Sequence, residues 1–209
     1  MTSRCQVLLV SGSLRRGSTN TALLQTARRV APDEIITVLY DGLDRLPHFD
    51  PDRDHPPLPA AVIELRNAIH NADAILFCTP EYAGALPGSF KNLLDWTIGD
   101  DRPRAIYNKP VAWVNASTSP TRAADAHESL RKVLGYAHAA TVADACVAIP
   151  VPRQAVGDDY LIEDPRVRTA ILATLTTLVA HARSQAAYEG TAAPDSAANM
   201  TIAPPRNSD

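Results

Sequence analysis

Short apolar runs alternate along this chain with longer stretches in which apolar residues recur at helical spacing. The apolar runs predict strands at residues 6–12, 34–40, 73–79, 110–116 and 140–150. The stretches between and after them predict helices at residues 20–30, 59–71, 87–98, 123–136 and 164–187. Strands that alternate with helices form parallel sheets covered on both faces. The pattern therefore predicts an α/β fold with a doubly wound, five-stranded parallel sheet.

The alternation of predicted strands and helices ends before the last residues of the chain. Residues 1–187 are expected to form a single domain, which a chain of 209 residues with 45% hydrophobic residues can bury around one core. Residues 188–209 are small, polar and contain prolines, so this tail is predicted to be disordered.

Charge and cysteine content narrow the class of protein. The net charge of −3, without a long basic run, argues against nucleic acid as a partner. Apolar runs are shorter than the roughly 18 residues of a membrane-spanning helix, and the amino-terminal residues lack a signal-peptide core. The three cysteines form no CxxC pair, so no metal site is expected, and His127 and Glu128 are interpreted as surface residues of the fourth helix. We expect a cytoplasmic protein that acts on no membrane.

A first polar cluster, "VSGSLRRGSTN", follows the first predicted strand. Backbone N–H groups at a helix amino end, with serine donors and arginines beside them, form a site for a phosphate. Leu14 occupies the second glycine position of a G-x-G-x-x-G dinucleotide loop, and Ser18 replaces the lysine of a Walker loop. A terminal phosphate monoester remains the expected ligand. An ordinary turn capped by Ser18 is the alternative.

A second cluster, "TPEYAGALPGSFKNLLDW", follows the third predicted strand. In a sheet of order 2-1-3-4-5 the first and third strands are neighbours, and a crevice opens where their helices diverge to opposite faces. Tyr82 can form an aromatic wall there, and the backbone around Gly84 can approach a flat ligand. The alternative is a Pro/Gly turn in which Tyr82 only packs and Glu81 caps a helix.

The two clusters together resemble the NADPH-dependent FMN reductase family of flavodoxin-like proteins. Its pattern, G-S-x-R-x-x-S-x-N and then P-E-Y-x-x-x-x-P-G-x-x-K-N-x-x-D-W, is matched in both blocks. The resemblance implies a flavodoxin-like fold, with FMN as cofactor and NADPH or NADH as hydride donor. It places the FMN phosphate at Ser13, Arg15, Ser18 and Asn20, and the FMN ring at Pro80, Glu81, Tyr82, Ala83, Gly84 and Ser117. This chain departs from the family pattern at Ala83 and in its glycine-poor third loop.

The resemblance implies an oxidoreductase that passes hydride from NAD(P)H through the flavin to a small electron-poor acceptor, such as a flavin, a quinone or an azo compound. No catalytic residue is named, because in such enzymes the protein binds and orients while the cofactor reacts. Two alternatives stay open: a flavodoxin-like electron carrier, and an interaction protein that keeps the fold without flavin. Apolar residues on the third and fourth helices favour a homodimer, with a dimer of dimers as the larger assembly.

Overall fold

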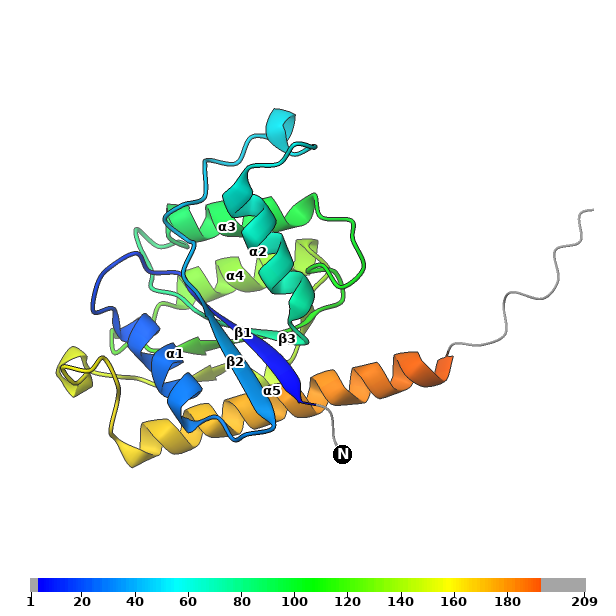
Figure 1. The fold of residues 1–209 in the computed structure, drawn as a ribbon. Coiled ribbons are helices and arrows are strands. Elements are labelled where there is room, and N and C mark those ends of the chain that lie inside the picture. The colour runs from blue at the N-terminus through cyan, green and yellow to red at the C-terminus, as the bar shows by residue number, and fades with distance from the viewer. Residues whose placement is uncertain (1–3, 193–209) are drawn as a thin grey trace, which may run out of the picture.

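A parallel sheet runs through the middle of the protein in the computed structural model, which describes residues 4–192 (Figure 1). The sheet order is β2-β1-β3-β4-β5, and every pairing in it is parallel. This confirms the predicted order and the flavodoxin-like class. The strands are β1 (Cys5–Ser11), β2 (Ile35–Tyr40), β3 (Ala74–Cys78), β4 (Pro110–Asn115), β5 (Ala140–Thr141) and β6 (Val147–Ala148).

Helices cover both faces of the sheet because alternate side chains of each strand point to opposite faces. In β1, Val7 and Leu9 pack in the core under α1 and α5, whereas Leu8 and Val10 pack under α2, α3 and α4. All four side chains are buried. The helices are α1 (Thr19–Val30), α2 (Ala60–Asn71), α3 (Gly88–Ile98), α4 (Ala124–Tyr136) and α5 (Pro165–Ala192).

The fifth strand differs from its prediction. Instead of one strand over residues 140–150, β5 pairs with the start of β4 and β6 with its end, and a 3-10 turn at Ala143–Ala145 separates them. Alanine and aspartate have low strand propensity, and the edge of a sheet offers hydrogen bonds on one side only. The turn instead buries Ala145 in the core under α5.

The last helix is longer than predicted. α5 continues to Ala192, five residues beyond the expected end of the domain at Ala187. Ala186 and Ala187 are strong helix formers, and each residue added to an existing helix gains a hydrogen bond. The rest of the expected tail lies outside the described residues.

The proline-rich segment between β2 and α2 is held against α3. Asn92 accepts a hydrogen bond from Phe49 N at 2.7 Å and donates one to Pro47 O at 2.8 Å. Trp96 donates its indole N–H to the same Pro47 oxygen at 2.9 Å, and its ring lies edge-on to Phe49. Asn92 and Trp96, both from the second sequence cluster, therefore fix this long loop.

A buried ion pair ties the same segment to α2 and α3. Arg66 donates to Asp54 at 2.6 Å and to the carbonyl of Trp96 at 2.9 Å. The side chains of Arg66 and Asp54 are only 5% and 10% exposed. Removing one partner of such a pair leaves a buried charge without compensation.

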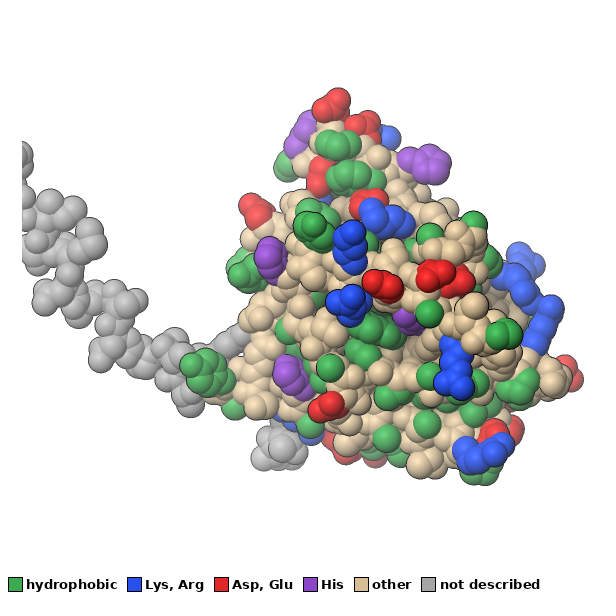
Figure 2. Space-filling view, turned by 180° about the vertical axis from the view of Figure 1, so that it is seen from behind, with side chains coloured by type: hydrophobic (Ala, Val, Ile, Leu, Met, Phe, Trp, Pro, Cys, Tyr) green, Lys and Arg blue, Asp and Glu red, His purple; other side chains and the backbone are tan. Residues whose placement is uncertain are grey.

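The outer surface carries charges of both signs. Figure 2 shows Lys and Arg side chains interspersed with Asp and Glu over the face seen from behind. Within residues 4–192, none of the helices combines the length and apolar character that crossing a membrane requires.

We expect Asp54→Ala to lower the free energy of unfolding by about 3–5 kcal/mol, because it leaves the Arg66 guanidinium buried without its carboxylate partner. Urea denaturation followed by circular dichroism measures this loss. Glu128→Ala is the matched control, since it breaks an exposed pair with Arg131 and should cost under about 1 kcal/mol. Equal losses of unfolding free energy in the two variants would show that the buried ion pair contributes no more to stability than the exposed one.

Candidate functional site

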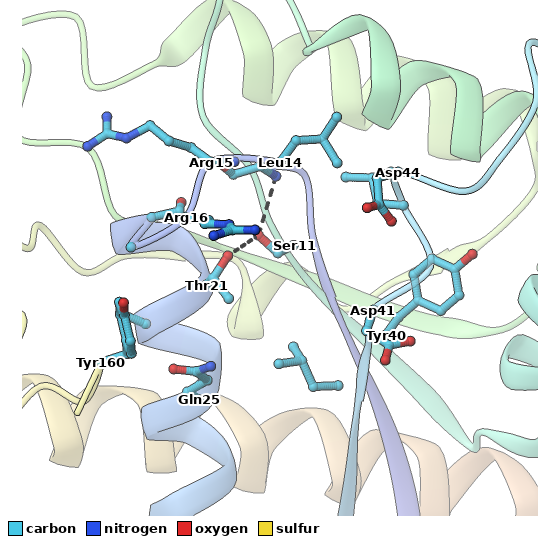
Figure 3. Close-up of a pocket in the computed structure, with 16 residues that line it drawn as sticks. Ser11, Leu14, Arg15, Arg16, Thr21, Gln25, Tyr40, Asp41, Asp44 and Tyr160 are labelled. Carbon is cyan, nitrogen blue, oxygen red and sulfur yellow. Dashed lines mark hydrogen bonds between the residues drawn. The ribbon is translucent and has the colours of Figure 1, made fainter. Parts of the chain in front are cut away.

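The loop between β1 and α1 is shaped by its own hydroxyl groups. Ser11 and Thr21 share a hydrogen bond of 2.8 Å between their side-chain oxygens (Figure 3). Ser13 N donates to the Ser11 hydroxyl at 3.3 Å, and Arg15 N donates to the Ser13 hydroxyl at 3.3 Å. Serine side chains that bond to nearby backbone groups stabilise turns without a regular element. The loop is therefore ordered by contacts within itself.

The amino end of α1 has no side-chain cap. Ser18 is the N-cap residue and is 5% exposed, yet its side chain makes no capping hydrogen bond. The first helical bond runs from Ala22 N to Ser18 O at 2.9 Å, and the first turn contains no acidic residue. The N–H groups of a first turn have no partner inside the helix and attract anions. This end of α1 fits a phosphate better than the capped turn considered as the alternative.

Gly12 brings the loop against the third strand. Its N–H donates to Cys78 O at 2.9 Å, which continues the pairing of β1 with β3. A Cβ at this position would lie 2.3 Å from Thr79 Oγ1 and 2.9 Å from the Phe90 ring. Asn20 faces the same strand end, where its side-chain oxygen accepts a bond from the Cys78 thiol at 3.2 Å. The loops after β1 and β3 therefore start side by side.

Residues 80–84 form a tight turn after β3. Tyr82 and Ala85 exchange backbone hydrogen bonds of 3.1 Å, and Ala83 and Gly84 between them have φ values of 50° and 68°. Positive φ at both central positions is typical of two-residue hairpin turns. Tyr82 is 54% exposed beside this turn, so its ring is open to a ligand.

The third loop is tied to this turn through a carboxylate. Glu81 accepts a hydrogen bond from Ala126 N, in the first turn of α4, at 3.0 Å. Ser117 lies before that helix, where its N–H donates to Asn115 Oδ1 and its hydroxyl contacts Ser119, each at 2.9 Å. Together with the Gly12 contact, Glu81 gathers the loops after β1, β3 and β4 at the carboxyl edge of the sheet.

His127 lies inside the protein, contrary to the prediction of a surface residue. It is 8% exposed, and its Nδ1 lies 2.7 Å from the Ala123 carbonyl, which can only accept. The ring proton is therefore on Nδ1, Nε2 is buried without a partner in the described chain, and burial lowers the pKa of the ring. Ala123 has a φ of 52°, so the chain turns sharply just before α4. Glu128 is exposed as expected.

A cavity of about 360 Å³ opens beside the first loop, on its β2 side (Figure 3). Ser13, Arg15 and Ser18 line it, whereas Asn20, residues 80–84 and Ser117 do not. In the close-up the two arginines diverge: Arg16 reaches over Ser11 and Thr21, while Arg15 extends away from them. The first loop thus faces two regions, this cavity and the gathered loops.

Sequence reasoning missed several lining residues of this cavity. They come from the end of β2 and from the segment before α5, and include Tyr40, Asp41, Asp44 and Tyr160. No local motif in the sequence links them to the first loop; the structure does, since Gly17 has a φ of 64° and a Cβ there would lie 3.4 Å from the Tyr160 ring.

Residues 5–153 match the family described as NADPH-dependent FMN reductase. The chain belongs to this family. The match confirms the resemblance found in the two polar clusters, and with it the prediction of an FMN-dependent NAD(P)H oxidoreductase.

Individual relatives agree with this assignment. An NAD(P)H-dependent FMN reductase of Pseudomonas aeruginosa is 37% identical over 138 residues, which cover 65% of this chain and 72% of the relative. A quinone reductase of Escherichia coli K12 is 32% identical over the same shares. Among solved structures, FerB, a flavoenzyme NAD(P)H:(acceptor) oxidoreductase from Paracoccus denitrificans, superposes with a TM-score of 0.71 at 26% identity. The superposition covers 85% of this chain and 98% of FerB.

We expect Gly12→Ala to lower the free energy of unfolding by about 1–3 kcal/mol, because the added methyl group overlaps Thr79 and Phe90. Thermal or urea unfolding gives the difference. Gly88→Ala is the matched control: no atom lies within 4 Å of the place that its Cβ would take, and alanine favours the helix. A Gly12→Ala protein as stable as the Gly88→Ala protein would contradict the close approach of the two loops.

Proposed function

We propose that this member of the FMN reductase family binds FMN across the gathered loops and reduces small electron-poor acceptors, quinones among them, with NAD(P)H. The uncapped, buried amino end of α1 at Ser18 is the observation that carries the proposal. It leaves backbone N–H groups free for a phosphate at the position that the family pattern gives to FMN. The names of the relatives, an FMN reductase and a quinone reductase, support the same chemistry.

The proposed FMN site extends from the first loop to the third. Ser13, Arg15, Ser18 and Asn20 hold the phosphate, and the ring lies along residues 80–84 and Ser117. Arg15 supports this assignment because it lines the same cavity as Ser13 and Ser18. Tyr82, half exposed beside a turn with positive φ, gives the ring an aromatic neighbour.

When bound at these residues, FMN would supply the redox chemistry between the nicotinamide donor and the acceptor. The protein's part is to bind and orient. Glu81 contributes by fixing the turn at residues 80–84 to α4, rather than by moving a proton. Cys78 is occupied by its contact with Asn20, and burial raises the pKa of its thiol far above the usual range. These groups are structural, so we assign no catalytic acid or base.

A flavodoxin-like electron carrier and a flavin-free interaction protein are less well supported. Members of the family that resemble this chain are named reductases, and the amino end of α1 lacks a side-chain cap, as a phosphate site requires. We also propose that the enzyme acts in the cytoplasm. Its described cysteines are free thiols, as expected for a reducing compartment.

We expect Arg15→Ala to raise the dissociation constant of FMN by roughly 10- to 150-fold, the effect of losing a charge-assisted hydrogen bond of about 1.5–3 kcal/mol. Quenching of flavin fluorescence on titration measures the affinity. Ser129→Ala on α4 is the control and should bind FMN as the parent does. If Arg15→Ala leaves FMN affinity unchanged, the phosphate lies elsewhere.

A homodimer is proposed from large apolar side chains that are exposed, among charged ones, near the ends of α3 and α4. Ile98, Tyr107 and Tyr136 are 55%, 68% and 77% exposed and line one cavity of about 510 Å³. Large exposed side chains that gather in one place mark contact surfaces. Light scattering at micromolar concentration should give the mass of two chains, or of four if dimers pair. The mass of a single chain would refute the proposal.

A further inference from the structure

The loop between β4 and α4 contains a turn with a backbone conformation that residues other than glycine rarely adopt. Ala124 N donates to Thr121 O at 3.1 Å, and Arg122 and Ala123 between them each have a φ of 52°. Positive φ at both central positions of a turn favours glycine or asparagine, because a Cβ crowds the backbone there. Arginine and alanine both carry a Cβ. The turn at residues 121–124 therefore needs other contacts to hold its shape.

Side chains from both ends of the loop bind the carbonyl groups of this turn. Asn115, the last residue of β4, donates its side-chain N–H to Arg122 O and accepts a hydrogen bond from Ser117 N at 2.9 Å. His127, in the first turn of α4, donates from Nδ1 to Ala123 O at 2.7 Å. Two neighbouring carbonyl groups are thus held, one from the strand and one from the helix.

The bond from the His127 ring is shielded from water. His127 is 8% exposed and Ala123 is 3% exposed. Water cannot take the place of a donor at such a position, so loss of the donor removes a hydrogen bond without replacement. The same Ala123 oxygen accepts the backbone N–H of His127 at 3.2 Å, which starts the hydrogen bonding of α4. The imidazole therefore fixes the peptide group at which the loop becomes the helix.

The loop held in this way begins at Ser117. Ser117 and Arg122 share the side chain of Asn115, so the position of one depends on the position of the other. The turn at residues 80–84 meets the same helix end, where Glu81 accepts a hydrogen bond from the first turn of α4. Both segments that would contact the FMN ring therefore depend on how α4 begins.

We propose that His127 is a positioning residue for the FMN ring: its bond to the Ala123 carbonyl holds the loop in a shape that glycine would otherwise be needed to provide. The inference deepens the proposed function and rests on it, since that function places the ring at Ser117 and residues 80–84. His127 acts through the loop and not by contact with the cofactor. Its task is to keep a proton on Nδ1 and a carbonyl group in place.

The first test compares flavin affinities by quenching of flavin fluorescence. We expect His127→Ala to raise the dissociation constant of FMN about 3- to 10-fold, the effect of losing one neutral hydrogen bond. Riboflavin, which has the ring without the phosphate, should weaken by the same factor. Circular dichroism checks that the variant is folded. If it is not, His127→Gln replaces it, because glutamine carries its amide group farther along the side chain than the position of Nδ1.

The decisive variant places glycine at the position with positive φ. Glycine adopts this conformation without crowding from a Cβ, so adding Ala123→Gly to His127→Ala should bring the dissociation constant of FMN back to within about twofold of the parent. Ala124→Gly is the matched control: it makes the same change one residue later, at the first helical position of α4, and should restore nothing. A histidine that only stabilised the core would not be rescued by glycine in the loop.

Cleavage by trypsin tests the same contact without flavin. Arg122 is exposed, and trypsin cleaves after arginine where the backbone can open. We expect cleavage after Arg122 to be faster in His127→Ala than in the parent. Cleavage after Arg45, exposed in the segment that follows β2, is the internal reference and should keep its rate.

Two results would overturn the inference: FMN affinity and cleavage after Arg122 that are unchanged in His127→Ala, or a loss of FMN affinity that Ala123→Gly restores no better than Ala124→Gly does. Both are obtained with a parent protein that binds FMN. The proposed function fails by a different sign, a parent protein that binds no FMN. The two failures are therefore distinguishable.

Discussion

The close approach of Gly12 to the end of the third strand sets where the first two loops of the candidate site leave the sheet. The Gly12 N–H to Cys78 O bond carries the parallel pairing one residue past β1, and the missing side chain leaves room for Thr79. The phosphate loop consequently leaves the sheet beside the turn at residues 80–84. Glu81 then joins that turn to α4. One backbone contact and one carboxylate thus hold three loops at the same edge.

The polar groups of the site divide into those that hold the loops and those left free for a ligand. Ser11, Thr21 and Glu81 have protein partners. The amino end of α1 has no side-chain cap, and the Tyr82 ring is half exposed. This division suits an enzyme whose cofactor carries the chemistry, because such an enzyme needs fixed binding groups more than it needs acids and bases. The family assignment rests on residues 5–153, which contain all of these groups.

Periodicity and chemistry in the sequence account for most of the fold. The alternation of strands and helices predicts the sheet, and each helix begins within one residue of its predicted start. The broken fifth strand was missed because its run of apolar residues does not show that the edge pairs with β4 at only two short places. The burial of His127 was missed because it depends on the sharp turn at Ala123.

The candidate site likewise contains residues that a local sequence pattern reveals and residues that come together only when the chain folds. The serines and Arg15 of the first loop stand in one motif, and this loop lies between β1 and α1 as the strand and helix pattern predicts. Tyr160 and Asp44 come from distant segments and share a cavity only once the chain is folded. Asn92 and Trp96 belong to the family motif, yet in the fold they hold the segment at Pro47. A motif therefore identifies a family without separating the residues that bind from those that support.

Flavin-dependent reduction by this protein is tested most directly by an anaerobic absorption spectrum of the purified protein with FMN, first with NADH or NADPH and then with a quinone. We expect FMN to stay bound through gel filtration, a nicotinamide donor to bleach its visible band, and the quinone to restore that band. Loss of FMN on gel filtration, or a band that neither donor bleaches, would contradict the claim that these loops form the site of a flavin-dependent reductase.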